Sequence, residues 1–106
     1  MPDYSYGEVV IRPFSYTDMQ SSKRRPALIL LDSDDGDVLV SRITSKHYDT
    51  PYDVEITSWS EVGLLVPSYI RLHKMIAVES SHIIKRLKKL SIEDLRIIKD
   101  TFRKIL

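Results

Sequence analysis

The sequence predicts a mainly β domain that ends in one α-helix, and three observations lead to this expectation. Residues 7–78 hold several short runs of β-branched and apolar residues, separated by turn-forming residues. Residues 91–106 place apolar side chains three and four positions apart, which is the spacing of a helix that buries one face. A length of 106 residues suits one domain. We therefore expect a single domain over 1–106, built as a small, strongly curved antiparallel sheet or barrel that the helix closes or caps.

The first half of the chain predicts strands on both sides of a long loop. Residues 7–14 are rich in β-branched side chains, and their proline confines this strand to an edge or places it at a strand end. Residues 15–25 show no sustained period and read as an exposed loop. Residues 27–31 form an apolar run typical of a strand buried on both faces. An Asp/Gly turn over 32–36 joins this run to residues 37–45 as a hairpin.

The second half of the chain predicts further strands. Residues 52–56 alternate between apolar and polar side chains, as in a strand with one wet face. Residues 59–67 form a connection with apolar residues of its own, and residues 68–72 and 74–78 are two strand-like pieces. Residues 82–90 fit either a helix or an edge strand, so both possibilities stay open.

The helix at the end of the chain has clear start signals. Ser91 suits the N-cap position, and Asp94, three residues later, is expected to be its capping-box partner. The apolar stripe that the helix lays against the sheet consists of Leu95, Ile98, Phe102 and Ile105.

Composition excludes several classes of protein. The chain has no cysteine, so a disulfide scaffold and a thiolate metal site are excluded. The longest apolar run, at 27–31, is too short to span a membrane, and acidic residues within the first twenty positions argue against a secretory signal. We expect a cytoplasmic protein that does not enter the membrane.

The sequence predicts no metal and no cofactor. The three histidines lack the spacing of metal ligands. The acidic turn at 32–37 departs from the pattern of a calcium-binding loop, so we interpret it as a hairpin turn. The three glycines form no phosphate-binding loop, which excludes nucleotide-triphosphate chemistry of that kind.

The net charge of +1 conceals an uneven distribution. The first 66 residues carry a balance of −5 and the last 40 a balance of +6. Such an asymmetry favours a polyanionic partner, although the basic part could equally be a solvated helix face.

Two short segments carry the residues best suited to binding phosphate. Lys23, Arg24 and Arg25 precede a proline that stiffens the chain, and guanidinium groups bind phosphate oxygens in pairs. Thr44 and Ser45 place two hydroxyls at a strand end beside Lys46, where they can donate hydrogen bonds to a substrate. The alternatives are a solvated basic loop and ordinary turn-forming hydroxyls.

The order of these segments resembles a known family. It consists of Gly-Glu-Val-Val at 7–10, a long loop, Arg-Pro-Ala-Leu-Ile-Leu at 25–30 and a later strand ending in Ile-Thr-Ser at 43–45. This is similar to the MazF/PemK family of toxin endoribonucleases, and the similarity extends over residues 52–56, 68–71 and the terminal helix. It implies a small SH3-like antiparallel β-barrel of the MazF/CcdB type, a homodimer, a cognate antitoxin and metal-independent cleavage of single-stranded RNA.

The resemblance also implies roles for individual residues. The catalytic arginine of the family corresponds to Arg25, and its strand-end threonine corresponds to Thr44. The implied nucleophile is the ribose 2′-hydroxyl, which leaves a cyclic phosphate and a free 5′-hydroxyl. Tyr16, Tyr48 and Tyr69 are candidates for stacking on bases. The residues implied to contact RNA are Lys23, Arg24, Arg42, Ser45, Lys46 and Arg71.

The chain departs from the family at one functional position. Some members carry an acidic residue, followed in several by glutamine, where this chain has Ser68 and Tyr69. The acid–base role of that carboxylate therefore has no counterpart here. Glu8 and His73 are the candidates for the general base that the sequence offers.

Two other functions remain open at this stage. A gyrase poison of the CcdB type shares the fold, but that group relies on a tryptophan in its C-terminal tail, whereas the sole tryptophan here is Trp59. The other alternative is a non-catalytic SH3-like module that binds RNA or a peptide.

Overall fold

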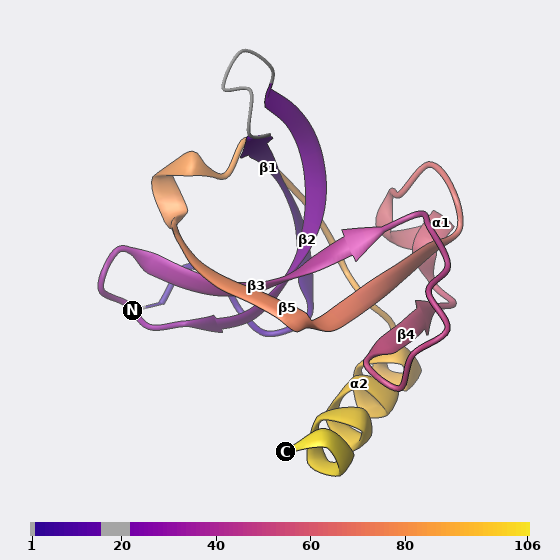
Figure 1. The fold of residues 1–106 in the computed structure, drawn as a ribbon. Coiled ribbons are helices and arrows are strands. Elements are labelled where there is room, and N and C mark those ends of the chain that lie inside the picture. The colour runs from indigo at the N-terminus through magenta and orange to yellow at the C-terminus, as the bar shows by residue number, and fades with distance from the viewer. Residues whose placement is uncertain (1, 16–21) are drawn as a thin grey trace.

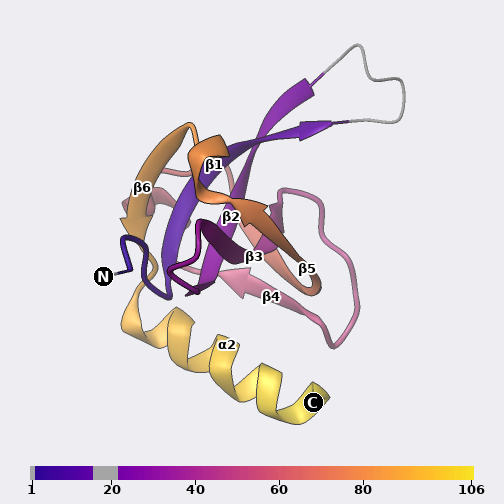
Figure 2. The same ribbon diagram turned by 90° about the vertical axis from the view of Figure 1, so that its left-hand side faces the viewer.

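The computed structural model describes residues 2–15 and 22–106, and it shows one antiparallel sheet and a long C-terminal helix. The strands lie in the order β4-β5-β3-β2-β1-β6 and curl into a half-barrel (Figure 1). Figure 2 shows the terminal helix lying across one end of this sheet. The predicted fold class is confirmed. The elements are β1 (Glu8–Ser15), β2 (Ser22–Asp32), β3 (Asp37–Thr44), β4 (Asp53–Ile56), α1 (Trp59–Val62), β5 (Ser68–Glu79), a 3₁₀ turn (Ser80–His82), β6 (Lys85–Lys89) and α2 (Ile92–Ile105).

The sheet buries apolar side chains on both of its faces. Alternate residues of each strand point to opposite faces, so Val9 and Val10 enter different clusters. The larger cluster is covered by α2, whose predicted apolar stripe packs against it. The smaller cluster includes Ala27 and Val40 and lies on the opposite face. Within the described residues, no helix is long and apolar enough to cross a membrane.

Long-range pairing changes three of the expected boundaries. Lys23, Arg24 and Arg25 belong to β2 and not to a loop, because they pair with β1. The two pieces expected between 68 and 78 form one bulged strand, β5. Of the two possibilities for 82–90, the edge strand is confirmed, because β6 pairs with β1.

The apolar run at 27–31 was expected to be buried on both faces and to be followed by a hairpin turn, and the structure confirms this in part. Leu28 and Ile29 are buried, but Leu31 is 56% exposed because a bulge shifts the β2–β3 register beside it. The predicted hairpin is present, and its Asp34 and Gly36 have positive φ angles. Carboxylates at positions 32 and 35 accept hydrogen bonds from backbone N–H groups of the turn.

The helix start is confirmed, but the capping box is wrong in one respect. The Ser91 hydroxyl accepts a hydrogen bond from the Asp94 N–H at 3.1 Å, as an N-cap should. The buried Asp94 carboxylate, however, does not reach back to Ser91. It accepts hydrogen bonds from the backbone and hydroxyl groups of Thr57 and Ser58, and the Ser58 hydroxyl takes the Ser91 N–H instead. Asp94 therefore ties α2 to the end of β4.

The chain also approaches α2 closely at Gly7. Its φ is +100°, and a Cβ atom there would lie 2.8 Å from Leu95 Cδ1. Tyr6 next to it donates its hydroxyl to the Leu95 carbonyl at 3.0 Å. Glycine is therefore required where the N-terminal segment crosses the helix.

Candidate nucleic-acid interface

A groove of about 490 Å³ opens where β2 and β3 meet the start of β5. Five of the eight predicted site residues line it, including Arg25 of β2 and Thr44 of β3. Its opposite wall comes from the loop after α1 and from β6. The lining residues are Ile11, Arg24, Arg25, Pro26, Arg42, Ile43, Thr44, Ser45, Gly63, Leu64, Leu65, Val66, Ser68, Lys85 and Leu87.

A row of arginines crosses the sheet beside this groove. Arg12 of β1 lies opposite Arg25 of β2, and Arg42 of β3 lies opposite Arg71 of β5. Ala27 links the two pairs, because it is two residues from Arg25 and opposite Arg42. Residues that are directly opposite or two apart share a face of a sheet. Four adjacent strands, about 4.8 Å apart, therefore each place one arginine on the same face.

Arg71 is held firmly at one end of this row. Its Nε donates to the Asp53 carboxylate at 2.9 Å, and the two side chains are only 13% and 2% exposed. Its guanidinium also lies 3.6 Å from the ring centroid of Tyr48, the distance of a cation–π contact. Arg71 does not line the groove, but this anchored guanidinium extends the positive face toward the loop after β3.

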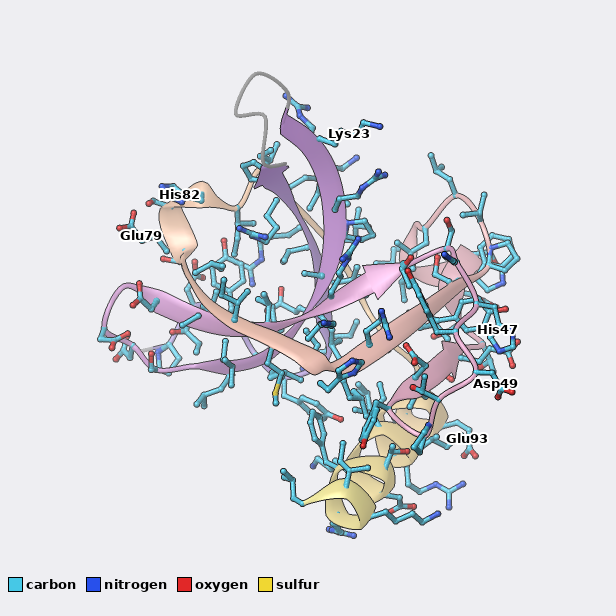
Figure 3. The ribbon with its side chains drawn as sticks, viewed as in Figure 1. Lys23, His47, Asp49, Glu79, His82 and Glu93 are labelled. Carbon is cyan, nitrogen blue, oxygen red and sulfur yellow. The ribbon has the colours of Figure 1, made fainter. Side chains whose placement is uncertain are left out.

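Thr44 stands at the last position of β3, where the ladder ends. Its Oγ1 accepts a hydrogen bond from the Lys46 N–H at 3.1 Å, which fixes the side chain and leaves the hydroxyl proton to donate. Lys46 Nζ lies 5.0 Å from the Tyr48 ring and is outside the groove wall. Lys23 lies at the outer end of β2, also outside the groove wall (Figure 3).

Aromatic rings gather on the sheet edge next to these cations. Tyr69, opposite Thr44 on β5, stacks on His47 with ring centroids 5.0 Å apart. The Tyr48 ring contacts both Lys46 and Arg71. Two of the three tyrosines considered for base stacking thus lie together, whereas Tyr16 is outside the described residues.

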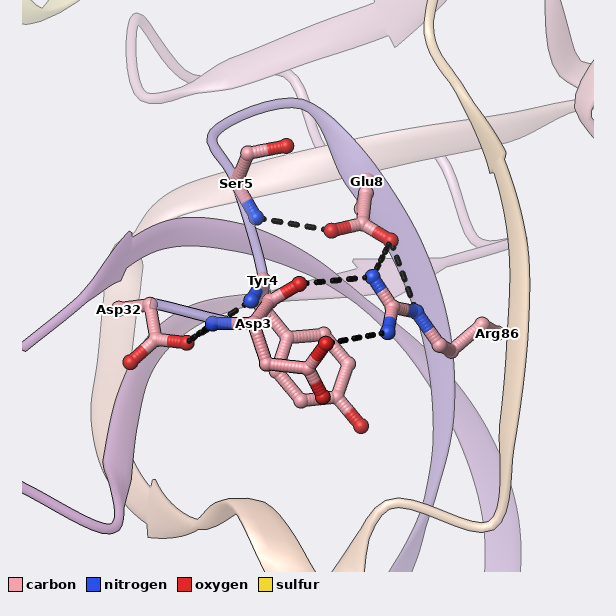
Figure 4. Close-up of polar contacts among 6 residues, drawn as sticks. All are labelled: Asp3, Tyr4, Ser5, Glu8, Asp32 and Arg86. Carbon is pink, nitrogen blue, oxygen red and sulfur yellow. Dashed lines mark hydrogen bonds and ion pairs between the residues drawn. The ribbon is translucent and has the colours of Figure 1, made fainter. Parts of the chain in front are cut away.

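Neither candidate for the general base lies in the groove. Glu8 accepts hydrogen bonds from Arg86 at 3.0 and 2.7 Å and from the Ser5 N–H at 2.8 Å, in a cluster that also holds Asp3 (Figure 4). His73 is exposed and packs on Tyr52 with ring centroids 4.9 Å apart. Ser68 does line the groove, and its hydroxyl donates to the Val66 carbonyl at 2.8 Å. Among the described residues that line the groove there is no carboxylate and no imidazole.

Three residues of this surface were not among the predicted site residues. Lys85 lines the groove because β6 pairs with β1, where it lies opposite Ile11. Leu65, 92% exposed, stands in the loop after α1 and gives the groove an apolar lip. Arg12 was missed because the first strand was expected to be apolar. Burial lowers the pKa of its guanidinium from the ordinary value.

Comparisons with known proteins agree on one fold. The profile of a family described as "PemK-like, MazF-like toxin of type II toxin-antitoxin system" matches residues 5–106. No curated protein matches the chain. The crystal structure of MazE-MazF (Form-III) from Deinococcus radiodurans is similar with a TM-score of 0.75 and 17% identity, covering 96% of this chain and 94% of that chain. An endoribonuclease in complex with its cognate antitoxin from a mycobacterial species has a TM-score of 0.73 and 15% identity, covering 93% and 90%.

Proposed function

The chain belongs to the PemK-like, MazF-like toxin family of type II toxin–antitoxin systems, and from this we propose that it is an endoribonuclease that cuts single-stranded RNA. One observation carries the proposal. Arg25 and Thr44, the two residues that the family pattern points to, come from different strands and meet on the wall of one groove. We propose that residues 1–106 act as one unit, with 2′-hydroxyl attack as the reaction.

In the proposed reaction the 2′-oxygen bonds to the neighbouring phosphorus and the bond from phosphorus to the 5′-oxygen breaks. The products are a 2′,3′-cyclic phosphate and a 5′-hydroxyl. Negative charge builds up on the phosphorus oxygens in the transition state. The planar, positively charged guanidinium of Arg25 supports that charge, while the Thr44 hydroxyl donates a hydrogen bond to a phosphate or ribose oxygen.

The nucleophile must also lose its proton. Because the described groove wall offers no carboxylate or imidazole, we propose that solvent water takes the proton from the 2′-hydroxyl and gives one to the 5′-oxygen as it leaves. Arg25 then supplies most of the rate enhancement. This assigns the groove a largely electrostatic mechanism that needs no metal ion.

The rest of the positive face suits the RNA backbone. Arg24, Arg42 and Ser45 line the same groove, and Arg71 continues the positive row beyond it. Lys23 and Lys46 flank the groove, where they add to the attraction for phosphates. Tyr48 and Tyr69 offer rings for unstacked bases. Binding through several such cations weakens steeply with salt.

The proposed partners follow from the family. Solved relatives include complexes with an antitoxin, so we propose that a cognate antitoxin inhibits this protein and that the toxin acts as a homodimer. Ser68 and Tyr69 stand where some members carry an acidic residue, followed in several by glutamine. This difference favours a second candidate, a module that binds RNA without cutting it. The family match argues against the gyrase-poison alternative.

Cleavage of a long single-stranded RNA in the presence of EDTA tests this function. The wild-type protein is expected to cut it, and Thr44→Val to cut it about 100-fold more slowly, because one donor to the developing charge is lost. Thr101→Val on α2 removes a hydroxyl that donates to the Ile97 carbonyl of its own helix and should cut normally. Undiminished cutting by Thr44→Val would contradict the role of Thr44. RNA binding without cutting by the wild type would establish the second candidate.

A further inference from the structure

A second cavity, of about 250 Å³, adjoins the groove, and most of its lining residues are not part of the groove. The two share Arg25, Pro26 and Arg42, so they are neighbours on the surface. Its floor is apolar, and its polar groups stand around the rim. The lining residues are Arg12, Arg25, Pro26, Ala27, Val40, Arg42, Lys74, Met75 and Ile76.

An irregularity in β5 shapes this cavity. While β3 advances one residue from Ser41 to Arg42, its partner on β5 moves four positions, from Met75 to Arg71. The extra residues bend β5 and turn Lys74 and Met75 toward the cavity. Bulges of this kind often stand next to binding sites, where they redirect a side chain.

Arg12 is the unusual group in this cavity. Its Nε is buried and has no hydrogen-bond partner among the described residues. A buried N–H without an acceptor is unfavourable, and such groups in folded proteins are few. An arginine also presents a planar fork of donors, which suits a flat partner with two neighbouring acceptors.

The rim is chemically one-sided. Arginine and lysine side chains donate hydrogen bonds and cannot accept them. The backbone of Ala27, Val40 and Arg42 is paired within the sheet, which leaves the side chains as the main recognition groups of the cavity. All four polar side chains of the rim are therefore donors only: Arg12, Arg25, Arg42 and Lys74.

We propose that this cavity binds a guanine base of the RNA substrate and that Arg12 selects it; this rests on the proposed ribonuclease function. Guanine presents N7 and O6 as adjacent acceptors, which arginine meets with two parallel hydrogen bonds. Adenine and cytosine offer an amino donor at the corresponding edge, and it would meet the donors of the rim. Uracil has one acceptor at that edge, so its expected affinity lies between that of guanine and those of adenine and cytosine. The apolar floor packs against the face of the base.

An acidic peptide would also suit the charge of the rim. The base is favoured because the cavity shares Arg25, Pro26 and Arg42 with the groove, and because the fork of the half-buried Arg12 side chain suits a flat pair of acceptors. Backbone phosphates alone would leave the apolar floor uncovered.

Short RNAs that differ at one nucleotide beside the mapped cut site test the assignment. The wild type is expected to cut the guanosine RNA at least about 10-fold faster than the adenosine RNA, the discrimination of one paired contact. Replacing guanosine by 7-deazaguanosine removes the N7 acceptor and should bring the rate close to that of adenosine. Arg12→Lys keeps the charge but loses the fork, so it should cut both RNAs at similar rates, as should Arg12→Ala.

The matched control is Arg103→Ala, which removes an exposed arginine of α2 and should keep the wild-type preference. A guanosine preference that persists in both Arg12 variants would overturn the proposal while leaving the ribonuclease intact. A wild type that cuts all the RNAs equally would overturn it too. Poly-L-glutamate can be tested for its ability to displace bound RNA. If both Arg12 variants kept the guanosine preference but were no longer sensitive to this competitor, the cavity would be a peptide site. A wild type that cuts no RNA would instead contradict the proposed function itself.

Discussion

Arg25→Ala is expected to lower the rate of RNA cleavage by about 1,000-fold, the largest loss of activity that a single change in the groove should cause. The reason is that Arg25 is the fixed cation proposed to meet the phosphate in the transition state. The described residues that line the groove include no carboxylate or imidazole that could supply acid–base catalysis in its place. The measurement is the single-turnover cleavage rate at saturating protein.

Two variants separate this role from general attraction of RNA. Arg25→Lys keeps the charge but not the fork, so it should bind RNA nearly as well as the wild type and still cut slowly. Arg103→Ala loses the same charge on the exposed side of α2 and should cut normally. Cleavage by Arg25→Ala within a few-fold of wild type, with the fold intact, would show that the assignment of Arg25 is wrong.

Asp94→Asn is expected to lower the free energy of unfolding by about 2–4 kcal/mol, because a buried acceptor of several hydrogen bonds is replaced by an amide that is half donor. The carboxylate accepts from both the N–H and the hydroxyl of Ser58 at 2.9 and 2.6 Å, and from Thr57. An asparagine NH₂ group turned toward Ser58 would face two donors. Urea unfolding at pH 7 measures the effect.

The same carboxylate predicts how stability depends on pH. Burial alone would raise the pKa of Asp94, but the hydrogen bonds from Ser58 and Thr57 outweigh burial and hold the pKa below its ordinary value. The stability it contributes is therefore complete above the unfolded pKa of about 3.9 and is lost as the pH falls through the lower folded pKa. The gap between wild type and Asp94→Asn should narrow in that acid range.

Asp100→Asn is the matched control for this prediction, because Asp100 is exposed on α2 and pairs only weakly with Arg103 at 3.4 Å. It should change the free energy of unfolding by less than about 0.5 kcal/mol. A similar stability for both variants, or a gap that stays constant from pH 7 to pH 3, would contradict the role given to Asp94.

Local signals in the sequence were enough to predict the main secondary-structure elements. The spacing of Leu95, Ile98 and Phe102 predicted the terminal helix, and Ser91 predicted its start. The Asp/Gly turn predicted the β2–β3 hairpin. These features depend on residues within a few positions of each other, so the local sequence is sufficient to predict them.

Contacts across the sheet could not be predicted in this way. Asp94 looked like a capping residue, but its partner Ser58 lies 36 positions away in the chain. Lys23 to Arg25 looked like a loop because nothing local shows that they pair with β1. Arg12 was not considered as a site residue, and only the register of four strands places it in the arginine row.

The candidate site also combines residues that local motifs indicate with residues that only long-range pairing brings in. The motif order indicated Arg25 and Thr44, which the fold then brings to one groove. The second wall contains Lys85 and Leu65. Lys85 belongs to an edge strand that the sequence pattern left open, and Leu65 follows a short helix that the pattern did not predict.

The central claim is that this groove cuts RNA by attack of a 2′-hydroxyl. Its most direct test uses two RNAs that are identical except that one carries 2′-deoxyribose on the 5′ side of the mapped cut, each incubated with the wild type in EDTA and analysed by mass spectrometry. The ribose RNA should yield a 2′,3′-cyclic phosphate and a 5′-hydroxyl, and the deoxyribose RNA should stay whole. Cutting of the deoxyribose RNA, 5′-phosphate ends, or failure to cut any single-stranded RNA would contradict the claim.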